Sequence, residues 1–337
     1  MKRILPLFLA LALLLTGCAA VSTTESTSQA VSQVDSPSSA LESAPESASS
    51  QLESISITDS NGSQITLDTS APRVVAAYGS FAEAWLLAGG ELCGVTQDAL
   101  EQRDLGLPED IAVVGTVKEP NAEEIIALEP DLVLLASDIT AQADIRDVLE
   151  NAGLACAFFQ VDTFADYAFM MEQLCAVTGR EDLYEENVTQ VGQQIEEAQA
   201  NAALSSTRPN VLLIRAFSTG IKAKTDDELA GAILKDLGAH NIADDHPSML
   251  EDLSLEEVIA ADPDYIFVTT MGDEQKALDY LNGLIQQNPA WSELSAVKED
   301  RYIVLPKDLF HYKPNNRWGE SYQYLGEILY PVFFDEA

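Results

Sequence analysis

The sequence is poor in basic and aromatic residues. Its 337 residues include only 18 Lys and Arg against 55 Asp and Glu, which gives a formal net charge of −37 at pH 7. Such a chain lacks the clustered positive charge of a broad nucleic-acid surface, so we expect no nucleic-acid partner. Apolar residues make up 47% of the sequence, which excludes a wholly disordered chain and is enough for one large or two ordinary domains.

The signatures of common enzyme classes are also missing. The sequence contains no GxSxG, HExxH, Walker phosphate-loop or GxGxxG motif. It has only three histidines, and of these only His311 is well placed for a cleft, whereas a zinc or manganese site would need several. Carboxylates are too abundant to single out as acid–base groups. We therefore expect a protein that is not an enzyme and has no catalytic cofactor or directly bound metal ion.

The four cysteines, at positions 18, 93, 156 and 175, include no CxxC pair. This spacing argues against a disulfide-dense scaffold and against a structural zinc site on cysteine. If Cys18 is modified, three cysteines remain, and at least one of Cys93, Cys156 and Cys175 cannot join an internal pair.

The first 17 residues are typical of a secretory signal. Lys2 and Arg3 precede an apolar run from Ile4 to Leu15, which is shorter than the about 20 residues of a membrane span. The run ends in Leu15-Thr16-Gly17-Cys18, which matches the bacterial lipobox, where the cysteine is lipidated and becomes the first residue. A plain signal peptide cut nearby is the alternative. The motif favours lipidation at Cys18 and a location on the extracytoplasmic face of the cell membrane.

Residues 18–54 are predicted to hold the lipid anchor and a disordered tether. After the cysteine this segment is mostly Ser, Thr, Ala, Gln and Glu, with no Lys, Arg or aromatic residue. It cannot bury enough apolar surface to offset the entropy lost on ordering.

The rest of the chain has the pattern of an α/β protein. Residues 55–67 alternate apolar and polar residues around Asn61-Gly62, which predicts a β-hairpin. Short apolar strands then alternate with helices, and we expect those strands at 74–77, 92–96, 112–114, 132–136, 156–161, 211–217, 265–269 and 302–305, followed by a final helix near 317–330. This alternation predicts two parallel-sheet lobes, at 55–180 and 207–337.

Between these lobes, residues 181–206 are predicted to form a connecting helix. Apolar residues recur there every three or four positions, at Tyr184, Val188, Val191, Ile195, Ala198 and Ala202. This spacing fits one amphipathic helix of about 20 residues, or about 30 Å. A surface helix within one lobe would show the same pattern and is the alternative.

An internal repeat relates residues 121–133 to residues 254–266. Each copy begins with a good N-cap, Asn121 or Ser254, and carries a glutamate three positions on that could complete a capping box. This leaves Glu123 and Glu256 without an internal role. They either stabilise the helix dipole or form a two-point docking surface, with one carboxylate on each lobe.

A family resemblance rests on several of these features in order. They are the lipobox and tether, Arg73-Val74-Val75 leading to Tyr78-Gly79-Ser80, Val114-Gly115-Thr116 before Asn121-Ala122-Glu123, the connecting helix and the aromatic C-terminal helix. Together they resemble the helical-backbone (class III) substrate-binding lipoproteins of ABC transporters, which include binders of ferric siderophores, haem and cobalamin.

The resemblance implies a ligand cleft between the lobes of a monomeric protein. It further implies that an iron complex or a corrinoid is delivered to an ABC permease with its cytoplasmic ATPase. In this family one glutamate on each lobe pairs with permease arginines, and these glutamates correspond to Glu123 and Glu256. A surface-anchored sensory or adhesion module with the same fold and no transport role is the alternative.

The ligand-binding residues can be predicted from the strand ends, because ligands in open parallel sheets bind beyond the carboxyl ends of strands. The candidates are Tyr78, Ser80, Arg215, Thr270, Met271, His311, Tyr312 and Arg317. Ser80 could also cap a helix, with Glu83 as its capping-box partner.

The charge of the ligand follows from the basic residues near these strand ends. Six of them gather there, namely Arg215, Lys222, Lys224, Lys307, Lys313 and Arg317, and they predict a positive cleft for an anionic ligand. Simple charge balancing at the surface is the alternative. If the ligand is haem, Tyr78, Met271, His311 or Tyr312 could be its axial ligand.

Overall fold

The fold is seen in a computed structural model of the chain, which describes residues 54–251 and 253–334. All of these belong to the compact unit that begins at Gln51. The predicted signal peptide, Cys18 and residues 19–53 of the predicted tether lie outside the described residues. Within the described part, no helix is both long enough and apolar enough to cross a membrane.

The N-terminal lobe is built on a five-stranded parallel sheet in the order β5-β4-β3-β8-β9. Its strands are β3 (Val74–Ala76), β4 (Leu92–Val95), β5 (Ala112–Val113), β8 (Leu132–Ala136) and β9 (Ala155–Phe159). The predicted hairpin is also present, with β1 (Ile55–Thr58) antiparallel to β2 (Gln64–Leu67). A second short antiparallel pair joins β6 (Gly115–Thr116) to β7 (Glu119–Pro120).

Helices cover both faces of this sheet because successive strand residues point to opposite sides. Val133 and Leu135 of β8 pack with Ile125 and Leu149, from α3 (Ala122–Ala127) and α5 (Arg146–Asn151). Leu132 and Leu134 face α1 (Gly79–Leu87) and α6 (Phe164–Thr178) instead. Two short helices, α2 (Asp98–Glu101) and α4 (Thr140–Asp144), complete the lobe. Strands buried on both faces explain why the sequence shows continuous apolar runs.

The C-terminal lobe has a mixed sheet in the order β11-β10-β13-β14, and β12 pairs beside β10. The strands are β10 (Asn210–Phe217), β11 (Gly220–Lys224), β12 (His240–Asn241), β13 (Tyr265–Thr270) and β14 (Tyr302–Val304). All pairings are parallel except β10 with β11. The antiparallel edge strand β11 is a feature that we did not predict from the sequence.

The helices of this lobe again lie on both faces of the sheet. They are α9 (Leu229–Asp236), α10 (Leu255–Ala261), α11 (Glu274–Gln287), α12 (Ser295–Lys298) and α13 (Lys307–Phe310). Short 3-10 turns occupy 242–244, 247–250, 289–293 and 315–317. The predicted two-lobe α/β architecture is therefore confirmed.

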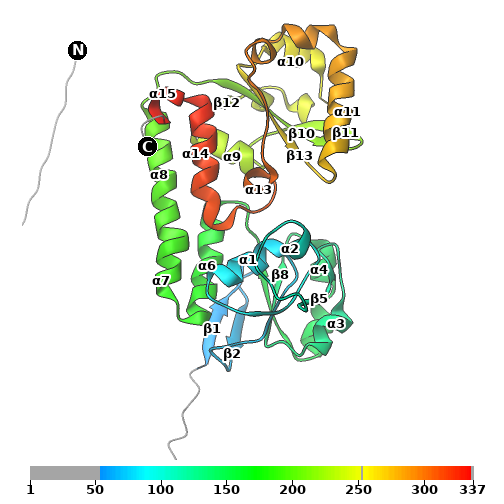
Figure 1. Ribbon diagram of the computed structural model, residues 1–337, viewed down its shortest axis with the longest axis vertical. Helices are drawn as coiled ribbons and strands as arrows, with labels where there is room; N and C mark the ends of the chain where they lie inside the picture. Colours follow the sequence, from blue (N-terminus) through cyan, green and yellow to red (C-terminus); the bar gives the residue numbers. More distant parts are fainter. Residues whose placement is uncertain (1–53, 252, 335–337) are drawn as a thin grey trace, which may run out of the picture. The chain divides into compact units, whose positions relative to one another are not determined.

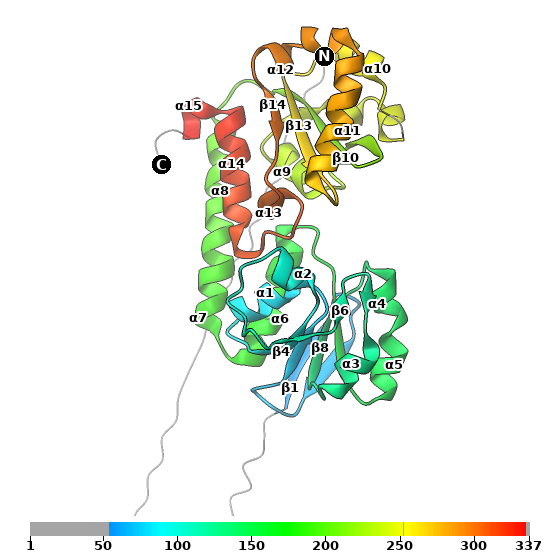
Figure 2. The same ribbon diagram turned by 45° about the vertical axis from the view of Figure 1, so that its right-hand side comes forward.

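The segment between the lobes is helical from Glu181 to Ala203. It consists of α7 (Glu181–Tyr184), a π-helical turn (Glu185–Thr189) and α8 (Gln190–Ala203). The apolar face predicted from the spacing is buried from Val188 to Ala202. Helix α14 (Trp318–Leu329) runs beside α8 in both views and is followed by α15 (Pro331–Phe334) (Figures 1 and 2). The two helices approach closely at Gly319, where a Cβ would lie 2.8 Å from Gln194 Cβ.

The internal repeat is visible in the helix starts. The Asn121 side chain accepts hydrogen bonds from the amides of Glu123 (3.1 Å) and Glu124 (3.3 Å), and Ser254 Oγ accepts one from Glu257 (3.3 Å). Both predicted N-caps are therefore confirmed. Glu257 does not complete the capping box, because its carboxylate accepts from Ser248 Oγ at 3.0 and 3.2 Å.

The repeat extends to the anchoring of the first strand of the five-stranded sheet in each lobe. Asp131 accepts a hydrogen bond from the Arg73 amide through its carboxylate (2.7 Å) and donates its own amide to the Arg73 carbonyl (2.8 Å). Asp264 forms the same pair of bonds with Asn210, both at 2.8 Å. These reciprocal bonds hold the start of β3 against the connection between α3 and β8. In the C-terminal lobe they hold the start of β10 against the connection between α10 and β13.

Candidate ligand-binding cleft

Side chains from both lobes line one cavity of about 930 Å³. Tyr78, Asp98 and Asp138 reach it from the ends of β3, β4 and β8, and Arg215 and Met271 reach it from the ends of β10 and β13. The cavity therefore lies where the carboxyl ends of parallel strands meet, which is where ligands bind in open α/β sheets.

Five of the eight ligand-binding residues predicted from the sequence line this cavity, namely Tyr78, Arg215, Met271, His311 and Tyr312. Ser80, Thr270 and Arg317 are not among the lining residues. Thr270 is buried within β13. Arg317 pairs with Asp308 (2.7 Å) and Glu320 (2.8 Å), so its guanidinium is occupied by carboxylates of the same lobe.

The predicted capping role of Ser80 is wrong. Helix α1 begins at Gly79 with Tyr78 as its N-cap residue, and Ser80 Oγ instead accepts a hydrogen bond from Arg103 Nη2 (2.7 Å). The carboxylate of Glu83, its predicted partner, forms an ion pair with the same guanidinium. Arg103 therefore contacts both Ser80 and Glu83, the two residues that the sequence pattern assigned to a capping box.

Arg103 also belongs to a junction between the lobes. Its Nη2 donates to the Lys313 carbonyl (2.8 Å), and Asn315 Nδ2 donates to the Ser80 carbonyl (2.9 Å) and to Glu83 Oε2 (2.6 Å). The Arg103 side chain is only 10% exposed. These bonds tie α1 to the segment between α13 and α14. Sequence reasoning missed this junction because its members are far apart in the chain and share no motif.

The cleft offers neutral donor groups. Burial, together with the nearby Arg215, Lys307 and Lys313 charges, lowers the pKa of His311 to about 4, so its imidazole is neutral at pH 7. Its Nδ1 is buried and has no hydrogen-bond partner among the described residues. Burial raises the pKa of both the Tyr78 and the Tyr312 phenols, so they stay protonated. With the Met271 thioether, these groups could contact an iron complex through N, O or S atoms.

The structure does not show the positive cleft that the sequence predicted. The Arg215 guanidinium forms an ion pair with Glu228, and Lys313 Nζ lies 3.1 Å from Asp162 Oδ1. Lys307 Nζ donates to the Gly272 carbonyl (2.6 Å), and Lys222 is exposed on β11. The sequence shows where cationic residues gather, but it does not show which carboxylates pair with them in the folded protein.

No bare metal site is apparent. Among residues 54–251 and 253–334, no group of three or more His, Cys, Asp and Glu side chains could hold a metal ion. The structure describes Cys93, Cys156 and Cys175 as free thiols.

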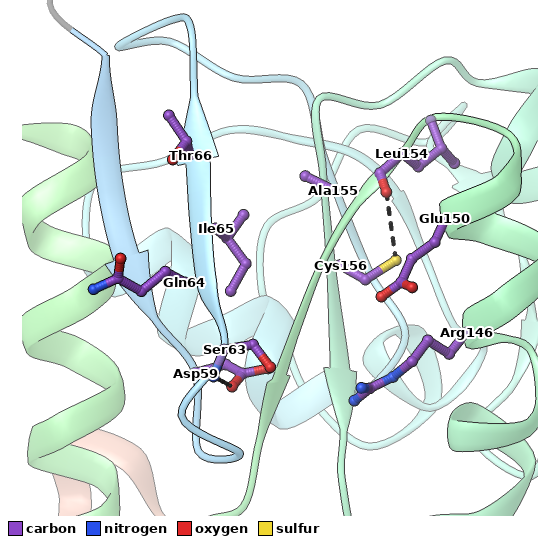
Figure 3. Close-up of a pocket in the computed structure, with 10 residues that line it drawn as sticks. All are labelled: Asp59, Ser63, Gln64, Ile65, Thr66, Arg146, Glu150, Leu154, Ala155 and Cys156. Atoms are coloured by element: carbon purple, nitrogen blue, oxygen red, sulfur yellow. Dashed lines mark hydrogen bonds between the residues drawn. The ribbon is translucent and has the colours of Figure 1, made fainter.

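A second, smaller pocket of about 280 Å³ lies between the β1-β2 hairpin and α5 (Figure 3). Asp59 in this pocket is buried, and its carboxylate already accepts backbone amides of Asn61 (3.0 Å), Ser63 (2.8 Å) and Phe158 (3.2 Å). Burial raises the pKa of Cys156 to about 12, so its thiol stays protonated. Internal hydrogen bonds therefore already occupy the Asp59 carboxylate, and the pocket shares no lining residue with the cleft.

The comparisons with known proteins agree with this geometry. The family model for periplasmic binding proteins matches residues 74–309, which is more than half of the chain. The chain therefore belongs to the periplasmic binding protein family, and its two-lobe fold places it in the helical-backbone class of ABC-transporter substrate-binding proteins. Members of this family bind substrates for transporters, so the expectation that the protein is not an enzyme is confirmed.

Particular relatives can be named. The Fe(3+)-citrate-binding protein YfmC of Bacillus subtilis is 26% identical over 270 residues, which cover 77% of this chain and 81% of that protein. Staphylococcus aureus IsdE, solved in complex with haem, has a TM-score of 0.64 at 19% identity and covers 77% of this chain and 99% of its own. S. aureus SirA, solved with staphyloferrin B, has a TM-score of 0.61 at 20% identity and covers 82% and 97%. The two structural matches show a shared fold.

Proposed function

We propose that this protein is an extracytoplasmic solute-binding lipoprotein that captures an iron complex in its cleft and delivers it to an ABC importer. The observation that carries the proposal is the cavity of about 930 Å³, which both lobes line at their strand ends with neutral N, O and S donors. A volume of this order suits a small molecule rather than a bare ion. The named binders of ferric citrate, haem and staphyloferrin B support an iron complex as the ligand class.

A thermal-shift panel tests the ligand class. The panel contains ferric hydroxamate, ferric catecholate, ferric citrate, haem and cobalamin. A ligand present at 100 times its dissociation constant should raise the free energy of unfolding by about 2.7 kcal/mol. We expect at least one iron complex to give such a shift, and haem binding would also move the Soret band. Stabilisation by cobalamin alone, or by no member of the panel, would contradict the proposal.

The lipid anchor is the second part of the proposal. Cys18 closes the lipobox Leu15-Thr16-Gly17-Cys18, so lipidation there would hold the protein at the membrane. The Cys18→Ser variant should be misprocessed or released, while the folded part keeps its thermal midpoint. Detergent-phase separation checks this outcome, and a variant that still partitions with lipid would show that the anchor lies elsewhere.

Permease docking is the third part, and it rests on Glu123 and Glu256. Both are exposed near the starts of the repeated helices α3 and α10, and neither forms an ion pair with another described residue. Two exposed carboxylates, one on each lobe, could meet two permease arginines, and salt would weaken such pairs.

The double variant Glu123→Ala/Glu256→Ala tests docking. We expect unchanged ligand affinity and stability, together with reduced uptake and reduced stimulation of the transporter ATPase. The matched control is Glu150→Ala/Glu293→Ala, which removes one exposed glutamate from each lobe outside the repeat. Normal transport by the docking variant across a range of ionic strengths would leave helix-dipole stabilisation as the role of both residues.

A further inference from the structure

The cleft is lined by more negative than positive groups. Six carboxylates contribute to its wall, from Asp98, Asp138, Asp162, Asp226, Asp227 and Glu228. Only three cationic side chains join them, from Lys118, Arg215 and Lys313. The chain as a whole carries a formal charge of −37, so the field of the rest of the protein adds to that of the cleft. Four of the six carboxylates are paired, Asp162 with Lys313, Asp226 with Lys235, Asp227 with Lys224 and Glu228 with Arg215. Asp98 and Asp138 are the lining carboxylates without an ion pair among the described residues, and they would repel an anionic ligand.

Glu228 neutralises the cations that could otherwise offset this charge. Its carboxylate pairs with the Arg215 guanidinium through one oxygen and with Lys224 Nζ (2.9 Å) through the other. Lys224 lies 3.1 Å from Asp227 as well. The side chains of Arg215 and Glu228 are only 15% and 16% exposed, so solvent screens their pairing weakly. The guanidinium best placed to hold a ligand carboxylate or catecholate is therefore already paired through Nη2, while its buried Nε has no partner among the described residues.

Asp98 supplies an independent sign of what the cleft would accept. This residue is 8% exposed and lines the cavity. Its Oδ2 accepts a hydrogen bond from the Gly79 amide (2.7 Å), but its Oδ1 is buried and has no partner among the described residues. A buried carboxylate oxygen without a donor is costly, and a ligand that carries an N–H, an O–H or a positive charge would satisfy it.

We propose that the cleft selects an iron complex of neutral or positive charge and that Glu228 determines this selectivity by occupying Arg215 and Lys224. The inference rests on the proposed function, since it concerns the charge of the complex bound in the same cleft. Ferric hydroxamates with a free ammonium group have the required chemistry. Ferric citrate, ferric catecholates and the propionates of haem carry the opposite charge.

Calorimetric titration of the purified protein tests the proposal with two probes, ferrioxamine B as a cationic ferric hydroxamate and ferric enterobactin as an anionic ferric catecholate. Wild-type protein should bind the cationic probe at least about tenfold more tightly, which corresponds to about 1.4 kcal/mol. The Glu228→Gln substitution keeps the size of the side chain but removes the charge that neutralises Arg215, while Lys224 keeps its pairing with Asp227. It should weaken the cationic probe and strengthen the anionic one, so that the ratio of the two affinities falls by about tenfold or more.

Two further variants keep the test informative. Asp98→Asn retains an acceptor for the Gly79 amide but removes the charge, and it should lower affinity for the cationic probe even if Glu228→Gln folds poorly. Glu293→Gln removes an exposed carboxylate whose pairing with Lys298 lies outside the cavity lining, and it should change neither affinity. Circular dichroism confirms that each variant is folded.

The outcomes separate this inference from the proposed function. Tighter binding of the anionic probe by wild-type protein, or an affinity ratio that neither Glu228→Gln nor Asp98→Asn changes, would overturn the charge selectivity while leaving an iron-complex binder. No binding of any iron complex, in this titration or in the wider ligand panel, would overturn the proposed function itself.

Discussion

The two lobes share one framework but differ in how the first strand of the larger sheet meets the helix that follows it. In the N-terminal lobe, β3 leads directly through Ala77 and Tyr78 to α1. In the C-terminal lobe, the antiparallel strand β11 lies between β10 and α9, and the turn after it carries Asp226, Asp227 and Glu228 to the cleft. The parallel strand β12, which follows α9, is only two residues long.

This difference separates structural support from ligand recognition. The parts that repeat, such as the N-caps and the Asp131 and Asp264 anchors, hold helices and strands together. The turn after β11, which has no counterpart in the N-terminal lobe, places acidic side chains in the cleft, and its Glu228 pairs with Arg215. On the proposal above, the charge selectivity of the cleft would therefore depend on the inserted hairpin and its following turn rather than on the repeated unit.

The largest expected effect concerns the glycines that allow the helix after each first strand to pack closely. A Cβ at Gly231 would lie 1.9 Å from the Thr225 carbonyl oxygen, in the turn after β11, whereas a Cβ at Gly79 would lie 2.8 Å from Asp98 Oδ2. Gly231→Ala should therefore destabilise the protein by about 3 kcal/mol or more, and Gly79→Ala by less. Urea unfolding measures both.

Gly283 is the control for this comparison. It lies in α11 with no heavy atom within 4 Å of its added Cβ, so Gly283→Ala should stabilise the protein by about 0.5–1 kcal/mol. If Gly231→Ala were as stable as wild type, α9 could not pack against the turn after β11 as described.

A pH dependence should arise from His311 in the C-terminal part of the cleft. Its pKa is about 4 in the folded protein and about 6.5 in the unfolded chain, so the unfolded state binds a proton first as the pH falls. Above pH 6.5 His311 does not lower the free energy of unfolding. Between about pH 6.5 and 4 its protonation in the unfolded chain lowers that free energy by up to about 3 kcal/mol. His311→Gln should lose less stability over this interval.

The measurement for His311 is the free energy of unfolding of both proteins at pH 7 and near pH 4.5. Only the difference between them reports on His311, because many carboxylates titrate in both. Equal losses in the two proteins would mean that His311 is not buried as described.

The smallest effects should come from the repeated anchors. Asp131→Ala and Asp264→Ala each remove a carboxylate that accepts a backbone amide, and each should cost about 1 kcal/mol. The Asn variants keep an acceptor oxygen and should cost less. Urea unfolding of all four variants would show whether the anchor stabilises the two lobes equally. A large loss in the free energy of unfolding in only one lobe would mean that the anchor contributes to stability in that lobe alone.

Much of the framework could be predicted from the sequence. The apolar runs of β8 and β13 are buried on both faces, and the repeat around Asn121 and Ser254 gives helix starts that local hydrogen bonds determine. The strand-end rule also placed Tyr78, Met271 and His311 at the cavity. The sequence also carries a signal for β11, because Ile221 and Ala223 alternate with Lys222 and Lys224 after a Ser-Thr-Gly turn, although the two lysines fit a basic patch as well.

The charge of the cleft could not be predicted in the same way. It depends on which carboxylate meets each cation after folding, as Glu228 meets Arg215 and Glu83 meets Arg103. The buried Oδ1 of Asp98 likewise depends on the burial of its whole surroundings, because the sequence shows only an aspartate after a strand. Local patterns fix helices and strands, whereas ion pairs between distant segments follow from the tertiary fold.

The cavity between the lobes is the proposed binding site for an iron complex. Ala232 lines this cavity from α9, so Ala232→Trp would fill part of it. The decisive measurement is a calorimetric titration of wild-type protein and Ala232→Trp with the iron complex that stabilises the protein most. We expect one ligand per wild-type molecule and a loss of at least about tenfold in affinity for the folded variant. Unchanged affinity in Ala232→Trp would place the ligand outside this cavity.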